Sequence, residues 1–179
     1  MGFFSFLKKD DTTSLEARKE ADLELLAPAT GTLVPLNEVP DLVISEKLIG
    51  DGVAIVPSEA KIVAPCDGVI SRLIVSNNAF AVRTTSGVEV YVTFGIGTNS
   101  FSGVGLSSQV SIGQTVTAGE TVILVDMDKV SEYLESTVTS MIVVNSSASI
   151  ARVISTSGKV LAGQTPCTWV ILEDEQPTN

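Results

Sequence analysis

The chain has 179 residues, of which 44% are hydrophobic and 5% aromatic, so a single domain with a core of mainly Val, Ile and Leu is expected. The formal net charge of −10 argues against a nucleic-acid-binding protein, because phosphate contacts need a clustered basic surface. The chain has no histidine, which excludes Ser-His-Asp and Cys-His catalysis and removes a common metal ligand.

The N-terminal segment, MGFFSFLKK over residues 1–9, combines apolar and basic side chains. These side chains are Phe3, Phe4, Phe6, Leu7, Lys8 and Lys9. Phe3, Phe6 and Leu7 would share one face of a helix, and the lysines suit an anionic membrane surface, so a flexible, membrane-associating arm is expected over residues 1–22. An equally weighted alternative is a terminus that docks on its own protein or has no role. The apolar part is too short to cross a bilayer.

Short strand-like segments, each closed by Gly, Pro, Asn or Asp, follow from residue 23 and predict an all-β fold. The expected strands are residues 23–27, 31–35, 52–56, 61–64, 68–75, 79–84, 88–94, 114–116, 121–126, 141–144, 151–155 and 167–172. The best helix candidate is residues 129–136, where Val130, Tyr133 and Leu134 recur at helical spacing after the potential caps Asp126 and Asp128. We therefore expect a β domain over residues 23–172 with one or two short helices, and an acidic disordered tail over residues 173–179.

Two pairs of segments echo each other along the chain. Residues 27–33, APATGTL, resemble residues 64–70, APCDGVI. Residues 112–122, IGQTVTAGETV, resemble residues 157–166, SGKVLAGQTP. Such pairs indicate a duplicated β-structure, and their irregular spacing favours a compact β-sandwich or barrel over a solenoid.

Residues 73–97, LIVSNNAFAVRTTSGVEVYVTFGIG, have the alternation of three short strands separated by polar breaks. The rest of the fold is expected to be built around this stretch. Asn78 and Thr93 place small polar side chains on neighbouring strands of an otherwise apolar sheet. This arrangement predicts a surface depression between the two strands.

Six segments carry a resemblance to a known family: VPD at 39–41, EKLIGDGVAI at 46–55, APCDG at 64–68, NNAF at 77–80, SGVE at 86–89 and TFGI at 93–96. They resemble the glucose-specific enzyme IIA domain of the bacterial sugar phosphotransferase system, from the N-terminus to about residue 172. The resemblance implies a β-sandwich built from a duplicated motif. It also implies a protein that takes a phosphoryl group from the phosphocarrier protein HPr and passes it to a cysteine of a permease IIB domain. In some bacteria the unphosphorylated form also binds and inhibits other sugar-uptake proteins.

The chain departs from the family pattern at the two histidine positions. The pattern NHAF has the phosphoryl-accepting histidine where this chain has Asn78, and the pattern VHFGID has a supporting histidine where this chain has Thr93. The acidic position of the second pattern is Gly97 here. An amide nitrogen is not nucleophilic, and Thr93 has no histidine to act as its base. Both positions are therefore predicted to be inactive in phosphoryl transfer.

The apolar positions that resemble the family's partner-docking surface stay apolar in this chain. They are Leu42, Val43, Ile44, Leu48, Ile49, Ile74 and Phe80. An exposed apolar patch of this kind usually marks an interaction site. For Val43, Leu48 or Phe80 taken singly, a core position is an equally good interpretation. Asp41 and Ser76 are the polar residues expected nearby.

These features predict a glucose IIA-like protein that does not relay phosphoryl groups and acts as a binding or regulatory protein in sugar transport. Its expected partners are HPr, the IIB/IIC permease or regulated uptake proteins. Its expected location is the cytoplasm, with peripheral contact at the inner face of the membrane. The alternative is an active phosphocarrier with a relocated acceptor such as Asp41, Thr93 or Cys66. A third hypothesis is a scaffold recruited to a new, membrane-linked role.

No cofactor or metal site is expected. The cysteines, Cys66 and Cys167, lack the spacing of a metal or redox motif and are expected to be free thiols, although a single disulfide stays open.

Overall fold

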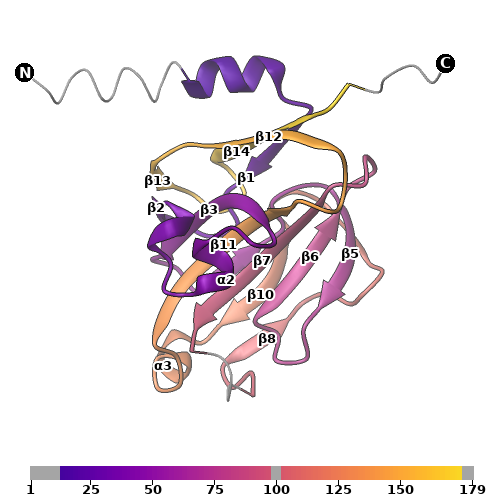
Figure 1. The fold of residues 1–179 in the computed structure, drawn as a ribbon. Coiled ribbons are helices and arrows are strands. Elements are labelled where there is room, and N and C mark those ends of the chain that lie inside the picture. Colours follow the sequence, from indigo (N-terminus) through magenta and orange to yellow (C-terminus); the bar gives the residue numbers. More distant parts are fainter. Residues whose placement is uncertain (1–12, 98–101, 175–179) are drawn as a thin grey trace, which may run out of the picture.

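The computed structural model describes residues 13–97 and 102–174, which fold mainly into β-strands (Figure 1). The strands are β1 (Leu23–Leu26), β2 (Gly31–Val34), β3 (Gly50–Pro57), β4 (Lys61–Val63), β5 (Gly68–Leu73), β6 (Ala79–Arg83), β7 (Glu89–Ile96), β8 (Leu106–Ser108), β9 (Thr115–Val116), β10 (Thr121–Val125), β11 (Ser136–Val144), β12 (Ile150–Ser155), β13 (Gly158–Val160) and β14 (Pro166–Leu172). The helical segments are η1 (Leu36–Glu38), α2 (Leu42–Ser45), α3 (Met127–Val130) and residues 13–20. The predicted all-β fold with short helices is confirmed.

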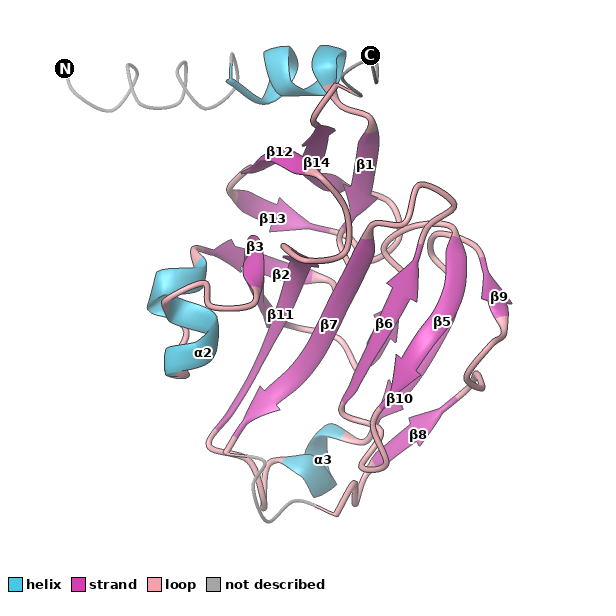
Figure 2. Ribbon diagram, turned by 45° about the vertical axis from the view of Figure 1, so that its right-hand side comes forward, coloured by secondary structure: helices cyan, strands magenta, loops and turns pink. Residues whose placement is uncertain are grey.

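The strands form one large sheet and two small ones, and every pairing is antiparallel. The large sheet has the order β13-β2-β3-β11-β7-β6-β5-β9, so β11, β7, β6 and β5 lie side by side (Figure 2). The small sheets have the orders β1-β14-β12 and β4-β10-β8. One main core of aliphatic side chains packs between the sheets, and it includes the fully buried Phe80 and Ile70. This arrangement is the predicted sandwich.

The predicted duplication is visible in matched backbone hydrogen bonds. The Ala27 carbonyl accepts from the Gly163 amide at 2.9 Å, and the Ala64 carbonyl accepts from the Gly119 amide at 2.8 Å. Gly119 and Gly163 lie against each other, so closely that a Cβ added to Gly163 would lie 2.6 Å from the Gly119 Cα. Both glycines have positive φ angles, which a side chain would strain. The two copies of each echoed segment therefore lie next to one another, around the contact between Gly119 and Gly163.

Several predicted elements differ in their bounds. The helix expected over residues 129–136 is the shorter α3, which begins at Met127 because the Asp126 carboxylate caps it by accepting from the Lys129 amide at 3.2 Å. Tyr133 is exposed and does not belong to an apolar helix face. The strand expected over residues 141–144 is the longer β11. Strands β8 and β13 and helix α2 were not predicted.

The helix of residues 13–20 is tied to the β1-β14-β12 sheet. Ala17 is buried, and Arg18 pairs with Glu24 at 3.1 Å. Glu24 also accepts a hydrogen bond from the indole N–H of Trp169 at 3.0 Å. The arm was predicted over residues 1–22, and residues 13–20 of it form this helix. Residues 1–12 of the arm and residues 175–179 of the predicted tail lie outside the described residues. Within the described ranges, none of the helices has both the length and the apolar character needed to cross a membrane.

Candidate functional site

Asn78 lies at the end of the tight hairpin that joins β5 to β6. The Asn77 amide donates to the Ile74 carbonyl at 2.8 Å, and the Ile74 amide donates to the Ala79 carbonyl at 2.9 Å. Asn77 has a φ of 56°, a left-handed conformation that asparagine tolerates better than most residues. Asn78 is only 7% exposed, and its Oδ1 accepts a hydrogen bond from the Ser76 hydroxyl. The hairpin thus fixes the amide in one orientation.

Thr93 lies next to Asn78 on the adjacent strand. Ala79 of β6 pairs with Thr93 of β7, and the Phe94 amide donates to the Asn78 carbonyl at 2.7 Å. A side-chain hydrogen bond joins Thr93 to Tyr91, which lies two residues earlier on the same face of the sheet. Asn78, which directly precedes β6, therefore lies next to Thr93 of β7.

The side chains hydrogen-bonded to Asn78 and Thr93, those of Ser76 and Tyr91, are uncharged at physiological pH. Burial raises the pKa of Tyr91 above its ordinary value, against the opposing effects of the Thr93 hydrogen bond and the Arg72 charge. Tyr91 therefore stays protonated and cannot serve as a general base. Ser76 and Thr93 are hydroxyls without an activating partner, and the Asn78 amide is no nucleophile. The hydroxyl and amide groups of this site can donate and accept hydrogen bonds.

Glu89, on the same face of β7, is a buried carboxylate paired with two arginines that are more than half exposed. Glu89 is 2% exposed and pairs with Arg72 at 3.0 Å and Arg83 at 2.8 Å, and it accepts a hydrogen bond from the Ser71 hydroxyl at 3.0 Å. Burial alone would raise the pKa of Glu89. The hydrogen bonds from Arg83 and Ser71 and the charges of both arginines outweigh it, and the net pKa lies below its ordinary value. Glu89 is therefore a fixed anion that joins β5, β6 and β7.

We expect Glu89→Gln to lower the free energy of unfolding at pH 7 by about 2 kcal/mol, less than for a fully buried pair because both arginines are more than half exposed. In a domain of this size that corresponds to a melting temperature about 4–8 °C lower. Because the folded-state pKa is depressed, the stabilisation by Glu89 is present above its unfolded pKa and is lost as the pH falls through the folded pKa. Thermal unfolding between pH 7 and pH 3 measures this.

The matched control is Glu59→Gln, since Glu59 is exposed and makes no ion pair with any described residue. Its melting temperature is expected to follow that of the wild type at every pH. The stabilising role of the Glu89 carboxylate would be refuted if both variants lost melting temperature equally. It would also be refuted if the difference in melting temperature between Glu89→Gln and the wild type grew towards acid pH.

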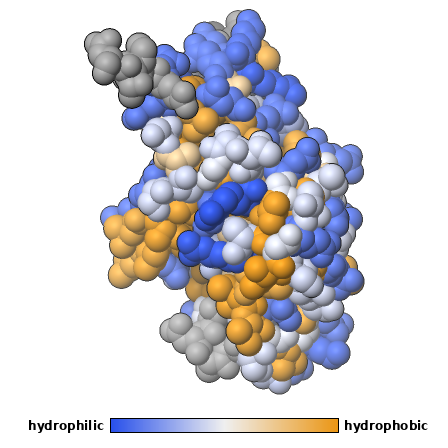
Figure 3. All heavy atoms as spheres, turned by 90° about the vertical axis from the view of Figure 1, so that its right-hand side faces the viewer, coloured by the Kyte–Doolittle hydropathy of each residue, from blue (hydrophilic) through white to orange (hydrophobic). Residues whose placement is uncertain are grey.

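Apolar side chains are exposed on both sides of the Asn78–Thr93 pair. On one side α2 covers the outer face of β3 and β11, with Ile44 packed beneath it and Leu42 76% exposed. On the other side the β5–β6 hairpin presents Ile74 and Val75, the latter 99% exposed. One view of the surface shows two hydrophobic areas separated by a hydrophilic strip (Figure 3). A partner that contacted both α2 and the β5–β6 hairpin would span β7, which carries Thr93.

The structure corrects part of the predicted docking surface. Leu42, Val43, Leu48 and Ile74 are exposed and Ile49 is half-buried. Ile44 and Phe80 are 7% and 0% exposed, so neither is available to a partner. Ile44 faces inward because α2 buries one side, and Phe80 alternates with Ala79 and points into the main core. Val75 is the exposed apolar residue that the sequence analysis did not single out.

Comparison with known proteins identifies the family. The family model described as phosphoenolpyruvate-dependent sugar phosphotransferase system, EIIA 1, matches residues 23–149. The chain belongs to this family. It is 37% identical over 164 residues to the PTS system glucose-specific EIIA component of Haemophilus influenzae, covering 92% of this chain and 95% of that protein. It is 38% identical over 146 residues to the protein of the same name from Borreliella burgdorferi, covering 82% and 72%.

A solved EIIA structure has the same fold. Glucose permease IIA from Mycoplasma capricolum aligns with a TM-score of 0.74 at 33% identity, over 82% of this chain and 94% of that one. The sandwich of this chain is therefore the glucose permease IIA fold.

The candidate relocated acceptors have other roles in this EIIA chain. The Asp41 carboxylate caps α2 by accepting from the amides of Val43 at 2.9 Å and Ile44 at 3.2 Å. Cys66 is a free, buried thiol, and burial together with the Asp67 charge raises its pKa to about 12. Cys167 is also free and buried. Among the described residues, no group of three or more Cys, Asp or Glu is arranged to hold a metal ion.

Ser140 is a feature of this EIIA site that the sequence analysis missed. It pairs with Thr93 across β11 and β7, and its side chain is on the same face. The residue is 1% exposed, and its hydroxyl has no hydrogen-bonding partner among the described residues. No sequence signal marks it, because its position opposite Thr93 depends on the register of β11.

We expect Ser140→Ala to stabilise the protein by about 1 kcal/mol, because it removes a buried hydroxyl that has no partner. Ser147→Ala is the matched control, since the Ser147 hydroxyl accepts from the Glu89 amide at 2.9 Å and donates to the Val144 carbonyl at 2.7 Å. This control is expected to destabilise. Urea unfolding midpoints measure both variants, and a Ser140→Ala loss as large as that of the control would show that the Ser140 hydroxyl is satisfied.

Proposed function

We propose that this EIIA-family chain binds other components of sugar transport and does not relay phosphoryl groups. One observation carries the proposal: Asn78 and Thr93, at the positions where the family pattern has histidines, lie side by side without a nucleophile or base. The whole chain lacks histidine, so no other imidazole can take over. A phosphoramidate on histidine is labile enough to pass on, and none of the neighbouring hydroxyl, amide or buried thiol groups offers an equivalent.

The exposed apolar side chains around the pair support the binding part of the proposal. Leu42 and Leu48 on one side and Ile74 and Val75 on the other would form the contact area. The partners proposed are HPr, the IIB/IIC permease components or uptake proteins that a IIA protein regulates. The proposed location is the cytoplasm.

The N-terminal segment is proposed to hold the chain at the inner face of the membrane. Its apolar and basic residues suit an anionic surface. Co-sedimentation with vesicles containing anionic lipid tests this, with the chain lacking residues 1–9 as the comparison. Binding of the full chain alone supports the role, and equal binding of both forms, or of neither, overturns it.

If the chain cannot be phosphorylated, its binding to a partner should not depend on the supply of phosphoenolpyruvate. The test measures how much purified glucose permease carrying a IIB domain is retained by the immobilised full chain, with and without phosphoenolpyruvate, enzyme I and HPr. We expect retention that does not change on adding phosphoenolpyruvate, whereas the Haemophilus influenzae EIIA component, run in parallel, is expected to change. No retention would reject this permease as a partner, and retention that follows phosphoenolpyruvate would reject the proposal.

A further inference from the structure

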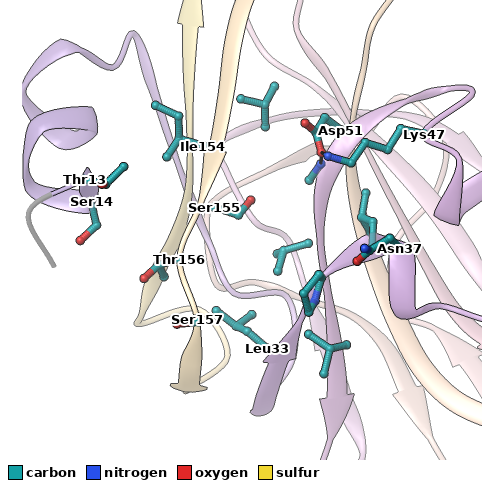
Figure 4. A pocket seen from close by; sticks show the side chains of 16 residues that line it. Thr13, Ser14, Leu33, Asn37, Lys47, Asp51, Ile154, Ser155, Thr156 and Ser157 are labelled. Atoms are coloured by element: carbon teal, nitrogen blue, oxygen red, sulfur yellow. Dashed lines mark hydrogen bonds and ion pairs between the residues drawn. The ribbon is translucent and has the colours of Figure 1, made fainter. Parts of the chain in front are cut away.

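A cavity of about 490 Å³ lies on another part of the molecule from Asn78 and Thr93, neither of which lines it (Figure 4). Its walls come from β2 and η1, from the start of β3, from β12 and from the beginning of the helix of residues 13–20. Small-molecule sites typically have volumes of roughly 300–1,000 Å³, so the space suits one compact ligand.

The charges in this cavity cancel. Lys47 and Asp51 are the charged residues among the described residues that line it, and the Lys47 ammonium pairs with the Asp51 carboxylate at 2.8 Å. Asp51 Oδ1 also accepts from the Gly52 amide at 2.8 Å, which fixes the carboxylate. A phosphorylated or carboxylated ligand would therefore find no free positive charge here.

Neutral hydrogen-bonding groups face the ion pair. Ser155 points from β12 towards Lys47 and Asp51, and Asn37 lies on the opposite wall (Figure 4). The Ser155 hydroxyl shares a hydrogen bond with Thr168 at 2.9 Å. The Asn37 amide is exposed and has no hydrogen-bonding partner among the described residues. Ser155 and Asn37 therefore offer both hydrogen-bond donors and acceptors to a ligand between them.

Apolar side chains complete the cavity. Leu33 and Val53 are buried in its floor, and Pro35 lies beside them in the lining. β12 and β3, which both line the cavity, also contact each other. Apolar walls with a few convergent neutral polar groups match a compact molecule that has both C–H faces and hydroxyl groups.

We propose that this cavity binds an uncharged small molecule with several hydroxyl groups, of the size of a monosaccharide. The C–H face of the ligand packs on Leu33 and Pro35, and its hydroxyls bond to Asn37, Ser155 and the polar edge of the Lys47–Asp51 pair. The inference rests on the cavity alone and is independent of phosphoryl transfer at Asn78 and Thr93.

The test is a titration of the isotopically labelled full chain with D-glucose, followed by amide chemical shifts. We expect saturable shifts confined to residues 33–37, 47–53 and 153–157. Glucose 6-phosphate is expected to bind at least about tenfold more weakly, since its charge has no free partner. Asn37→Leu is expected to weaken glucose binding about tenfold, the effect of roughly one good hydrogen bond.

Asn145→Leu is the matched control, because Asn145 is exposed and does not line the cavity. Both variants alter surface positions, and their amide spectra report whether they are folded. The control is expected to bind glucose as the wild type does. Absence of saturable shifts, shifts that map elsewhere, tighter binding of glucose 6-phosphate, or an Asn37→Leu variant that binds like the control would each overturn the proposal.

Discussion

We expect the double variant Asn78→His, Thr93→His to accept a phosphoryl group from phospho-HPr, at a rate at least about 100-fold above the wild-type background, because a positioned imidazole typically contributes 10²–10⁴-fold. The two positions already lie on paired strands. Ser76, whose hydroxyl now bonds to Asn78, would be left to orient the new imidazole at position 78. Ala79, the cross-strand neighbour of Thr93, has a small side chain. Acid-labile radiolabel on the variant after incubation with phosphoenolpyruvate, enzyme I and HPr measures the gain.

The control for this gain is Asn77→His, which places an imidazole on the same hairpin one residue away. Because Asn77 has a left-handed backbone and does not occupy either family histidine position, no label is expected. Equal labelling of the control and the double variant would show that any histidine on this hairpin suffices. If the double variant is folded but unlabelled, the two histidines alone are not sufficient for phosphoryl transfer from HPr.

The second large effect is expected at the exposed apolar side chains. Leu42→Asp combined with Leu48→Asp is expected to weaken binding to HPr about 1,000-fold, because two apolar anchors at an interface that each cost about 2 kcal/mol when lost together cost about 4 kcal/mol. Both side chains are more than half exposed, so the fold should be unaffected. Titration calorimetry with purified HPr measures the affinity, and circular dichroism checks the fold.

Leu161→Asp is the matched control, because Leu161 is also exposed but follows β13, away from α2. It is expected to bind HPr as the wild type does. If the double variant keeps wild-type affinity, HPr does not contact α2. If the control loses affinity equally, the loss reflects added negative charge on a chain whose net charge is already −10.

The strands were largely predictable because their alternation and their closing turns are local signals. Helix α2 was missed because its residues, Leu42 to Ser45, are apolar and too few to show helical periodicity, and only the Asp41 cap marks its start. Strand β13 has only three residues. Phe80 was misplaced because every residue from Ala79 to Val82 is buried, so the strand shows no alternation that would tell its two faces apart.

The candidate site was predictable where it depends on neighbouring strands and not where it depends on distant ones. Asn78 directly precedes β6 and Thr93 belongs to β7, the next strand, so their proximity followed from the hairpin order. Ser140 reaches the site through the register between β7 and β11, which no local pattern reveals. Glu89 looked like an ordinary strand end, and only the pairing of β5, β6 and β7 brings Arg72 and Arg83 to it.

The most direct test of the central claim is phosphoryl transfer to the wild-type full chain. The chain is incubated with radiolabelled phosphoenolpyruvate, enzyme I and HPr, beside the Haemophilus influenzae EIIA component as the positive control, and the intact proteins are analysed for acid-labile label. We expect label on the control and none on the wild-type chain. Acid-labile phosphate on the wild-type chain, at any residue, would contradict it.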